Sequence, residues 1–311
     1  GGGLTGSGGT GCQVVEGRCE MKGKDAVRSR GLLTLVLIVL IGASVASSVG
    51  IFYDEGVGPF ELETVRGGMV TAYGYGIYRH MSADVAIQGV AQDYVTLFLG
   101  IPALAVAYLL ARSGGLRWRL LLSGVLGYFL VTYLFYLVMG TYNELFLLYA
   151  LLLGSSFFAL ARLLLTVDLE ELKGAFMLGR AARFGGGFLM VTAALIGLLW
   201  LSVVVPPILD GSIYPRELAH YTTLVVQGLD LGLLLPLSFV SGLLLRRGSS
   251  LGILVGGTYL VFLSLLMTAL IAKIVAMAFN GVNVIPAVLI IPAIALVAYF
   301  SAWRVLAAVR G

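Results

Sequence analysis

The stretch LGILVGGTYLVFLSLLMTALIA, residues 251–272, contains no charged side chain. A helix needs about 20 apolar residues to cross the hydrocarbon core of a bilayer. Similar runs recur along the chain and predict spans at residues 31–53, 94–111, 120–142, 145–167, 184–209, 221–245, 251–272 and 282–303. Because no run alternates with a period of two, helices are favoured over a β-barrel. The sequence therefore predicts an all-α, polytopic transmembrane helical bundle of eight spans.

The composition excludes an ordinary soluble protein. Of the 311 residues, 59% are hydrophobic and 12% charged, and the mean hydropathy is +1.00. These values lie far outside the range of soluble domains. The net charge of +4 could suggest nucleic acid, but the charged residues lie between the apolar runs. We expect the lipid bilayer as a partner and no nucleic acid.

The distribution of charge predicts the orientation of the bundle. With a cytoplasmic start, 16 basic and 6 acidic residues fall on the inner side, against 4 basic and 10 acidic on the outer side. This asymmetry follows the positive-inside rule. Both termini are therefore predicted to be cytoplasmic.

Residues 1–30 are predicted to form a flexible, Gly-rich and then basic cytoplasmic N-terminus. Both cysteines, Cys12 and Cys19, precede Met21, which could be the true start, so thiol chemistry is not expected. The first apolar run could also be a cleaved signal peptide ending at Ala46. Its length favours a retained span, so that residues 31–311 form the transmembrane domain.

Two segments outside the predicted spans have a character of their own. Residues 52–92 form an outer loop, predicted to be an extracytoplasmic cap between spans one and two, with a hairpin around Arg66. On the inner side, a capping box at Asp168 opens an amphipathic helix over residues 168–183. This helix is either a connector on the inner leaflet or a sensor of anionic lipid.

Asp230 is the clearest functional candidate because a charge in hydrocarbon is costly. Arg246 marks the inner end of the same predicted span. At about 1.5 Å per residue, Asp230 lies roughly 24 Å above Arg246, inside a core of about 30 Å. Lys273 is the expected partner, since its long side chain can reach down from the interface.

Further polar residues are predicted near the same membrane face. Asp93 opens the second span, Asn143 and Glu144 precede the fourth, and Lys273 closes the seventh. The two histidines, His80 and His220, are expected in the loops above. Together with Asp230 these residues predict an outward-facing ligand or ion site. The alternative is that charges at helix ends only decorate the interface.

No cofactor is indicated by the sequence. Two histidines and several carboxylates could hold zinc or iron, but His80 and His220 are far apart and belong to no metal-binding motif. Each of four prolines, Pro102, Pro236, Pro286 and Pro292, would remove a helix hydrogen bond, and transporters place substrate sites at helices broken at mid-depth. No internal repeat is evident, which weakens that interpretation.

Three stretches carry a resemblance: Tyr75–His80, Gln92–Pro102 and Tyr142–Tyr149. They resemble a family of uncharacterised multi-pass integral membrane proteins of bacteria and archaea. The family has no assigned activity. The resemblance implies that Asp93, Asn143 and Glu144 belong to the family's recurrent pattern, and it implies no catalytic role.

We therefore expect a multi-pass protein of the cytoplasmic membrane of a prokaryote, with three functional hypotheses. A small-solute or ion-coupled permease would use Asp230 as a proton or cation site. A non-catalytic subunit, assembly factor or sensor, with an oligomeric or membrane-complex partner, would use the charges to fix helix packing. A membrane enzyme would use an outer site of histidines and carboxylates.

Overall fold

The computed structural model describes residues 12–15, 18–21, 23–177, 179–212 and 214–310. Within these ranges, eight helices are long and apolar enough to cross a membrane, which confirms the predicted number. They are α2 (Arg30–Phe52), α3 (Ala83–Val95) continuing into α4 (Ile101–Ala111), α5 (Leu116–Val138), α6 (Phe146–Leu165), α8 (Gly179–Leu209), α9 (Val225–Leu229) continuing into α10 (Leu235–Arg246), α11 (Ser250–Phe279) and α12 (Ala287–Ala308).

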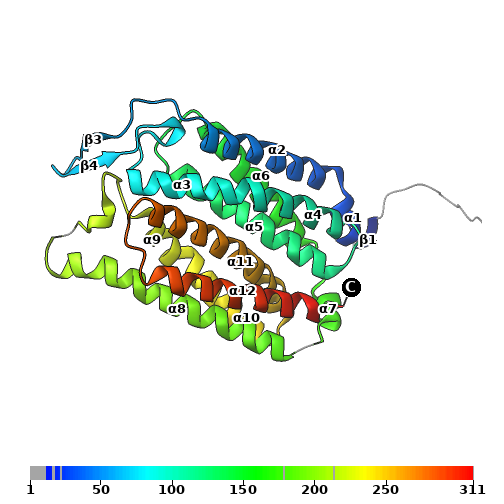
Figure 1. The fold of residues 1–311 in the computed structure, drawn as a ribbon. Helices are drawn as coiled ribbons and strands as arrows, with labels where there is room; N and C mark the ends of the chain where they lie inside the picture. Colours follow the sequence, from blue (N-terminus) through cyan, green and yellow to red (C-terminus); the bar gives the residue numbers. More distant parts are fainter. Residues whose placement is uncertain (1–11, 16–17, 22, 178, 213, 311) are drawn as a thin grey trace, which may run out of the picture.

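The shorter elements lie at the two ends of the bundle (Figure 1). One end carries the hairpin of β3 (Phe60–Glu63) and β4 (Met69–Ala72), and we call it the hairpin end. The other carries α1 (Gly23–Arg28), α7 (Leu169–Ala175) and the C-terminus, and we call it the basic end. The remaining elements are β1 (Cys12–Val15), paired with β2 (Arg18–Met21), and the 3-10 turns η1 (Gly76–Tyr78) and η3 (Arg216–Leu218).

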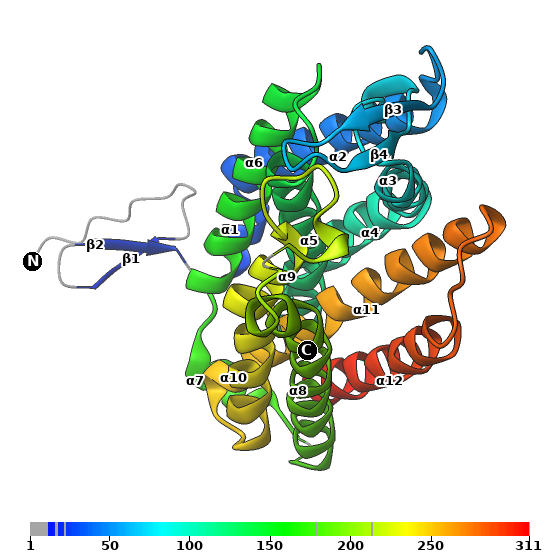
Figure 2. The same cartoon turned by 90° about the vertical axis from the view of Figure 1, so that its left-hand side faces the viewer.

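The eight helices form two halves with equivalent packing. In the first half, the α3–α4 helix packs against α2 and α5, and α6 packs against α2 and α5. In the second half, the α9–α10 helix and α12 make the corresponding contacts with α8 and α11. In the view from the hairpin end, the first half lies above the second half (Figure 2). Since four spans return the chain to the same membrane face, both halves have the same orientation.

The second helix of each half has the same irregularity. In the first half a π-helical segment, η2 (Thr96–Gly100), precedes Pro102, and in the second half η4 (Asp230–Leu234) precedes Pro236. Proline has no N–H, so the helix before it shifts to the wider hydrogen-bonding pattern. Each of these helices ends before a glycine with positive φ, Gly114 or Gly248. The repeat that the sequence did not reveal is therefore present in the structure.

The halves meet where α11 crosses α5 and packs against α3. At the crossing, a Cβ placed on Gly124 would lie 2.7 Å from the carbonyl oxygen of Thr258, so only glycine allows this approach. Phe129 is fully buried in the same core. The close contact fixes the two halves relative to each other.

Two predicted helix ends differ from the structure in a way that affects the candidate site. The second span begins at Ala83 rather than Tyr94, which places Asp93 well inside a continuous helix. The seventh span continues to Phe279 rather than ending at Ala272, which places Lys273 inside α11. In both cases a polar residue was interpreted as a helix end, although apolar sequence continues beyond it.

The segment 168–183 forms two elements rather than one helix. Asp168 caps α7, accepting hydrogen bonds from the backbone N–H groups of Glu170 and Glu171 at 2.9 and 3.1 Å. The helix ends at Ala175, and residues 179–183 already belong to α8. Leu172 is fully buried against the protein, so the apolar face of α7 packs on the bundle.

The segment between α2 and α3 contains the predicted hairpin. Strands β3 and β4 are antiparallel, with Glu61 opposite Thr71. The hairpin contacts the loop before α9, because the Arg66 guanidinium donates a hydrogen bond of 3.2 Å to the carbonyl oxygen of Tyr221. The Arg66 side chain also lies over the ring of Tyr214, at 4.9 Å.

Candidate charged site in the membrane

Asp93 is one of the most deeply buried charged residues described, with 1% of its surface exposed. Two tyrosine hydroxyls donate hydrogen bonds to its carboxylate. Tyr78, from η1, donates to Oδ2 at 2.5 Å, and Tyr136, from α5, donates to Oδ1 at 3.0 Å. Both carboxylate oxygens are therefore bonded, which offsets the cost of removing the group from water.

Glycine on α2 makes room for this carboxylate. A Cβ on Gly50 would lie 2.8 Å from Asp93 Cγ and 3.2 Å from the Tyr78 hydroxyl. Ser47, one turn earlier on the same helix, is fully buried, and its hydroxyl has no hydrogen-bond partner among the described residues. Helix α2 thus closes the site on one side with small residues.

Aromatic rings close the site on its other sides. Tyr136 meets the ring of Tyr78 edge-on at 6.4 Å and the ring of Tyr149 at 5.4 Å. Tyr133 stacks on Tyr149 at 6.0 Å. Phe129, Tyr133 and Tyr136 form an aromatic stripe along one face of α5, which is bundle core for most of its length, while Tyr136 also binds Asp93.

A second polar cluster involves Gln92, the residue before Asp93, and Thr96, about one turn after it. Gln92 donates hydrogen bonds to the Tyr128 hydroxyl at 2.8 Å and to the Thr132 hydroxyl at 3.3 Å. The Thr96 and Tyr128 hydroxyls are 2.9 Å apart. Thr96 begins η2, so this cluster fixes the irregular part of the helix against α5.

Asp230 lies at the start of the equivalent segment in the second half, η4. Its partner is Trp200 on α8, whose indole N–H donates a hydrogen bond of 2.7 Å to Oδ2. Asp230 is only partly buried, whereas Asp93 is closed off. The two carboxylates therefore occupy different environments.

Lys273 lies on α11, which packs against α3, the helix that carries Asp93, and against α10, which continues from the segment that begins at Asp230. In the described part of the chain, neither the Asp93 nor the Asp230 carboxylate lies within 4 Å of the Lys273 ammonium. The ion pair found there joins Arg79 to Glu144. The expected close pair of Asp230 with Lys273 is absent from these residues.

Glu144 and Asn143 lie apart from this set. Glu144 forms an ion pair with Arg79 at the surface, where 55% of its side chain is exposed. The hydrogen bond from the Arg79 guanidinium lowers the pKa of Glu144. Asn143 accepts a hydrogen bond of 2.9 Å from the backbone N–H of Leu145, which helps to start α6. These two residues have structural contacts of their own.

The two histidines lie close together at the hairpin end. The His220 ring nitrogen Nε2 is 2.9 Å from the carbonyl oxygen of His80. Arg79 Nε donates a weak hydrogen bond of 3.4 Å to His80 Nε2. Among the residues with described placement, no group of three His, Cys, Asp or Glu side chains could hold a metal ion.

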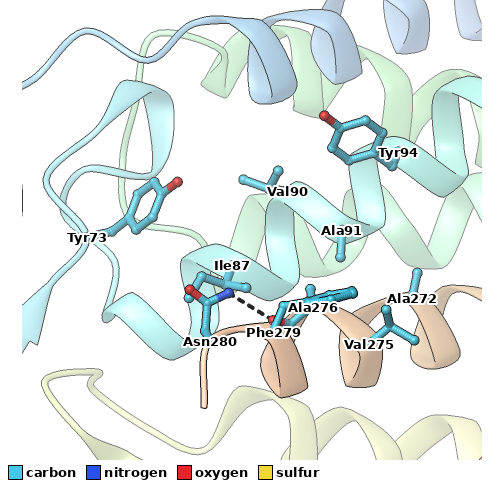
Figure 3. Close-up of a pocket in the computed structure, with 10 residues that line it drawn as sticks. All are labelled: Tyr73, Ile87, Val90, Ala91, Tyr94, Ala272, Val275, Ala276, Phe279 and Asn280. Atoms are coloured by element: carbon cyan, nitrogen blue, oxygen red, sulfur yellow. Dashed lines mark hydrogen bonds between the residues drawn. The ribbon is translucent and has the colours of Figure 1, made fainter. Parts of the chain in front are cut away.

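A groove of about 460 Å³ lies between α3 and α11 near the hairpin end (Figure 3). Its lining is mainly apolar and consists of Tyr73, Ile87, Val90, Ala91, Tyr94, Ala272, Val275, Ala276, Phe279 and Asn280. Asn280 donates its hydrogen bond to the carbonyl oxygen of Ala276 on its own helix. None of the candidate site residues lines this groove.

Tyr78, Tyr136, Trp200 and Gly50 were not expected at the site. Tyr136 stood in a recognisable aromatic stripe, but its hydroxyl could equally have faced another helix. Trp200 comes from a span without any charged residue near it. Only the packing of helices distant in sequence identifies these partners.

No family model, characterised relative or solved structure matches this chain. The functional argument therefore rests on the residues and their geometry.

Proposed function

We propose that the protein is an ion-coupled permease for a small solute, with Asp93, Asp230 and Lys273 as its coupling site. The observation that supports the proposal is that three ionisable side chains stand on membrane-spanning helices: Asp93 in the first half, and Asp230 and Lys273 in the second. A lysine held in one tight ion pair would suit a structural role better. Here neither carboxylate is within 4 Å of it among the described residues.

The charges of the set favour binding of one cation. When all three groups are ionised, one ammonium faces two carboxylates, and one negative charge remains. Leaving that charge uncompensated away from water is costly. A proton or a monovalent cation removes the excess, so its binding is linked to the position of Lys273.

The two carboxylates suit different roles. Asp93 accepts a hydrogen bond at each oxygen and is closed off, which favours a permanent counter-ion for Lys273. Asp230 has one bonded oxygen and is partly exposed, which favours the exchangeable proton or cation site. In this mechanism Lys273 pairs more closely with Asp93 when Asp230 is neutralised.

The architecture supports the same function. Many transporters consist of two structural repeats with a site at their interface, often next to interrupted helices. Here each half contributes one carboxylate from a helix with a π-helical segment and a proline. Such segments change register more easily than a regular α-helix.

The test is coupled charge movement in proteoliposomes adsorbed on a solid-supported membrane. Amino acids, sugars, organic anions and inorganic cations are applied in turn, with and without a pH gradient. At least one class should give a transient current that depends on the gradient. Asp230→Asn should abolish this current, whereas Asp84→Asn, an exposed carboxylate on the first turn of α3, should preserve it.

Thermal unfolding of the same variants separates the permease from a non-catalytic subunit. A permease variant Asp230→Asn still folds, with a modest loss of stability, but does not couple. If the wild-type protein gives no current with any class and Asp230→Asn only lowers the unfolding temperature, the permease is refuted and the charges serve helix packing.

A further inference from the structure

A cleft of about 400 Å³ lies at the basic end, where α7, α8, α10 and α11 meet. Four cationic side chains line it: Lys173, Arg183, Arg246 and Arg247. We propose that this cleft binds a phosphate group, supplied by the headgroup of an anionic phospholipid. This inference is independent of the proposed transport function.

Close packing of α8 and α10 brings the arginines together. A Cβ on Gly242 would lie 2.6 Å from the carbonyl oxygen of Gly186, and a Cβ on Gly186 would lie 2.8 Å from the backbone nitrogen of Arg246. Arg183 lies one turn before Gly186 on α8. The glycine contact therefore places Arg183 and Arg246 at adjacent helix ends.

The cluster has no acidic partner in the described residues. The ion pair found there, Arg79 with Glu144, lies at the opposite end of the bundle. Like charges held at one site repel each other, and an anion in the cleft removes that cost. Gly179, the first residue of the long helix α8, also lines the cleft, so the helix dipole adds to the positive potential.

The wall formed by the α7–α8 connection is held by the end of the chain. The backbone N–H of Met177 donates a hydrogen bond of 2.9 Å to the carbonyl oxygen of Ala308. Arg310 N–H donates a bond of 2.9 Å to the carbonyl oxygen of Ala175. The cleft is thus built from elements that are fixed to one another.

Its lining favours a lipid over free phosphate. Phe176, Met177 and Ile253 form apolar walls beside the cations. A phospholipid offers a phosphate for the arginines and an apolar part for these walls, whereas a free phosphate uses only the cations. Basic pockets between transmembrane helices bind anionic headgroups in this way.

The experiment measures the unfolding temperature of the detergent-purified full chain with added phosphatidylglycerol, phosphatidylcholine or inorganic phosphate. Phosphatidylglycerol should raise the unfolding temperature of the wild type by several degrees, and phosphatidylcholine should not. The double variant Arg246→Gln/Arg247→Gln should lose most of this shift. The matched control is Arg30→Gln/Arg112→Gln, which removes two exposed arginines at the same end and outside the cleft.

Two outcomes would overturn the proposal: an undiminished phosphatidylglycerol shift in the Arg246→Gln/Arg247→Gln variant, or an equal shift with phosphatidylcholine. A shift with inorganic phosphate as large as that with phosphatidylglycerol supports the phosphate site and assigns its ligand to the free anion. If the double variant does not fold, Lys173→Gln/Arg183→Gln tests the same cleft from its other wall.

Discussion

The backbone of Gly50 on α2 lies directly against the carboxylate of Asp93 on α3, so that a Cβ at position 50 would stand 2.8 Å from Asp93 Cγ. This contact ties the first helix of the bundle to a buried charge that also binds Tyr78 and Tyr136. The position of Asp93 thus depends on three different elements, and each of them can be tested by substitution.

Gly50→Ala should destabilise the protein by about 1–3 kcal/mol, because the added methyl group overpacks a filled site. The measurement is thermal or denaturant unfolding in detergent. Gly154→Ala is the control, since a Cβ there has nothing within 4 Å on a regular helix. Equal stability of the two variants would show that α2 does not pack closely against Asp93.

Tyr78→Phe and Tyr136→Phe should each cost roughly 1.5–3 kcal/mol, because each removes a hydrogen bond to a buried charged group. Their effects should not add, since both hydroxyls bind the same carboxylate. Tyr108→Phe is the control, a buried tyrosine of α4 with no hydrogen bond to Asp93. Unfolding free energies of the single and double variants give the comparison, and simple additivity with losses near zero would argue against the network.

Pro236→Ala should abolish coupled current while the protein still folds. The substitution restores a backbone N–H, which favours regular α-helix in place of η4. A change of register by one residue turns Asp230 by about 100° relative to the rest of the helix, away from Trp200. Pro292→Ala, within α12, provides the control. Normal coupling in Pro236→Ala would mean that η4 is not required.

The ion pair between Arg79 and Glu144 should contribute less than about 1 kcal/mol, because it is exposed. The pKa of Glu144 is lowered in the folded protein, so the contribution is present above the unfolded value of about 4.3 and is lost as the pH falls through the folded value. Unfolding temperatures of the wild type and Glu144→Gln should differ slightly at pH 7 and converge in acid. Glu63→Gln, another exposed glutamate, should show no such convergence.

The number of membrane-spanning helices could be predicted because each span needs a run of about 20 apolar residues, and such runs are visible in the sequence. The hairpin at Arg66 also followed from local sequence. The burial of Asp93 could not be predicted, since polar residues such as Gln88 and Gln92 precede it and placed the start of the membrane span after it. Gln92 is satisfied inside the bundle by Tyr128 and Thr132 of α5, and only tertiary packing shows this.

The repeat escaped detection for a related reason. Pro102 and Pro236 occupy equivalent places, as do Gly114 and Gly248, but the side chains that pack around them differ. Asp93 precedes its π-helical segment and Asp230 begins the other one. Equivalent backbones thus carry different polar residues, so sequence alone does not align the two halves.

The central claim is that Lys273 is shared between a carboxylate of each half. Double-mutant cycles of Lys273→Met with Asp93→Asn and with Asp230→Asn, measured as unfolding free energies in lipid nanodiscs, test it most directly. We predict coupling free energies of about 0.5–3 kcal/mol in both cycles, as found for interacting residues. Coupling with one carboxylate alone, or with neither, would contradict the claim.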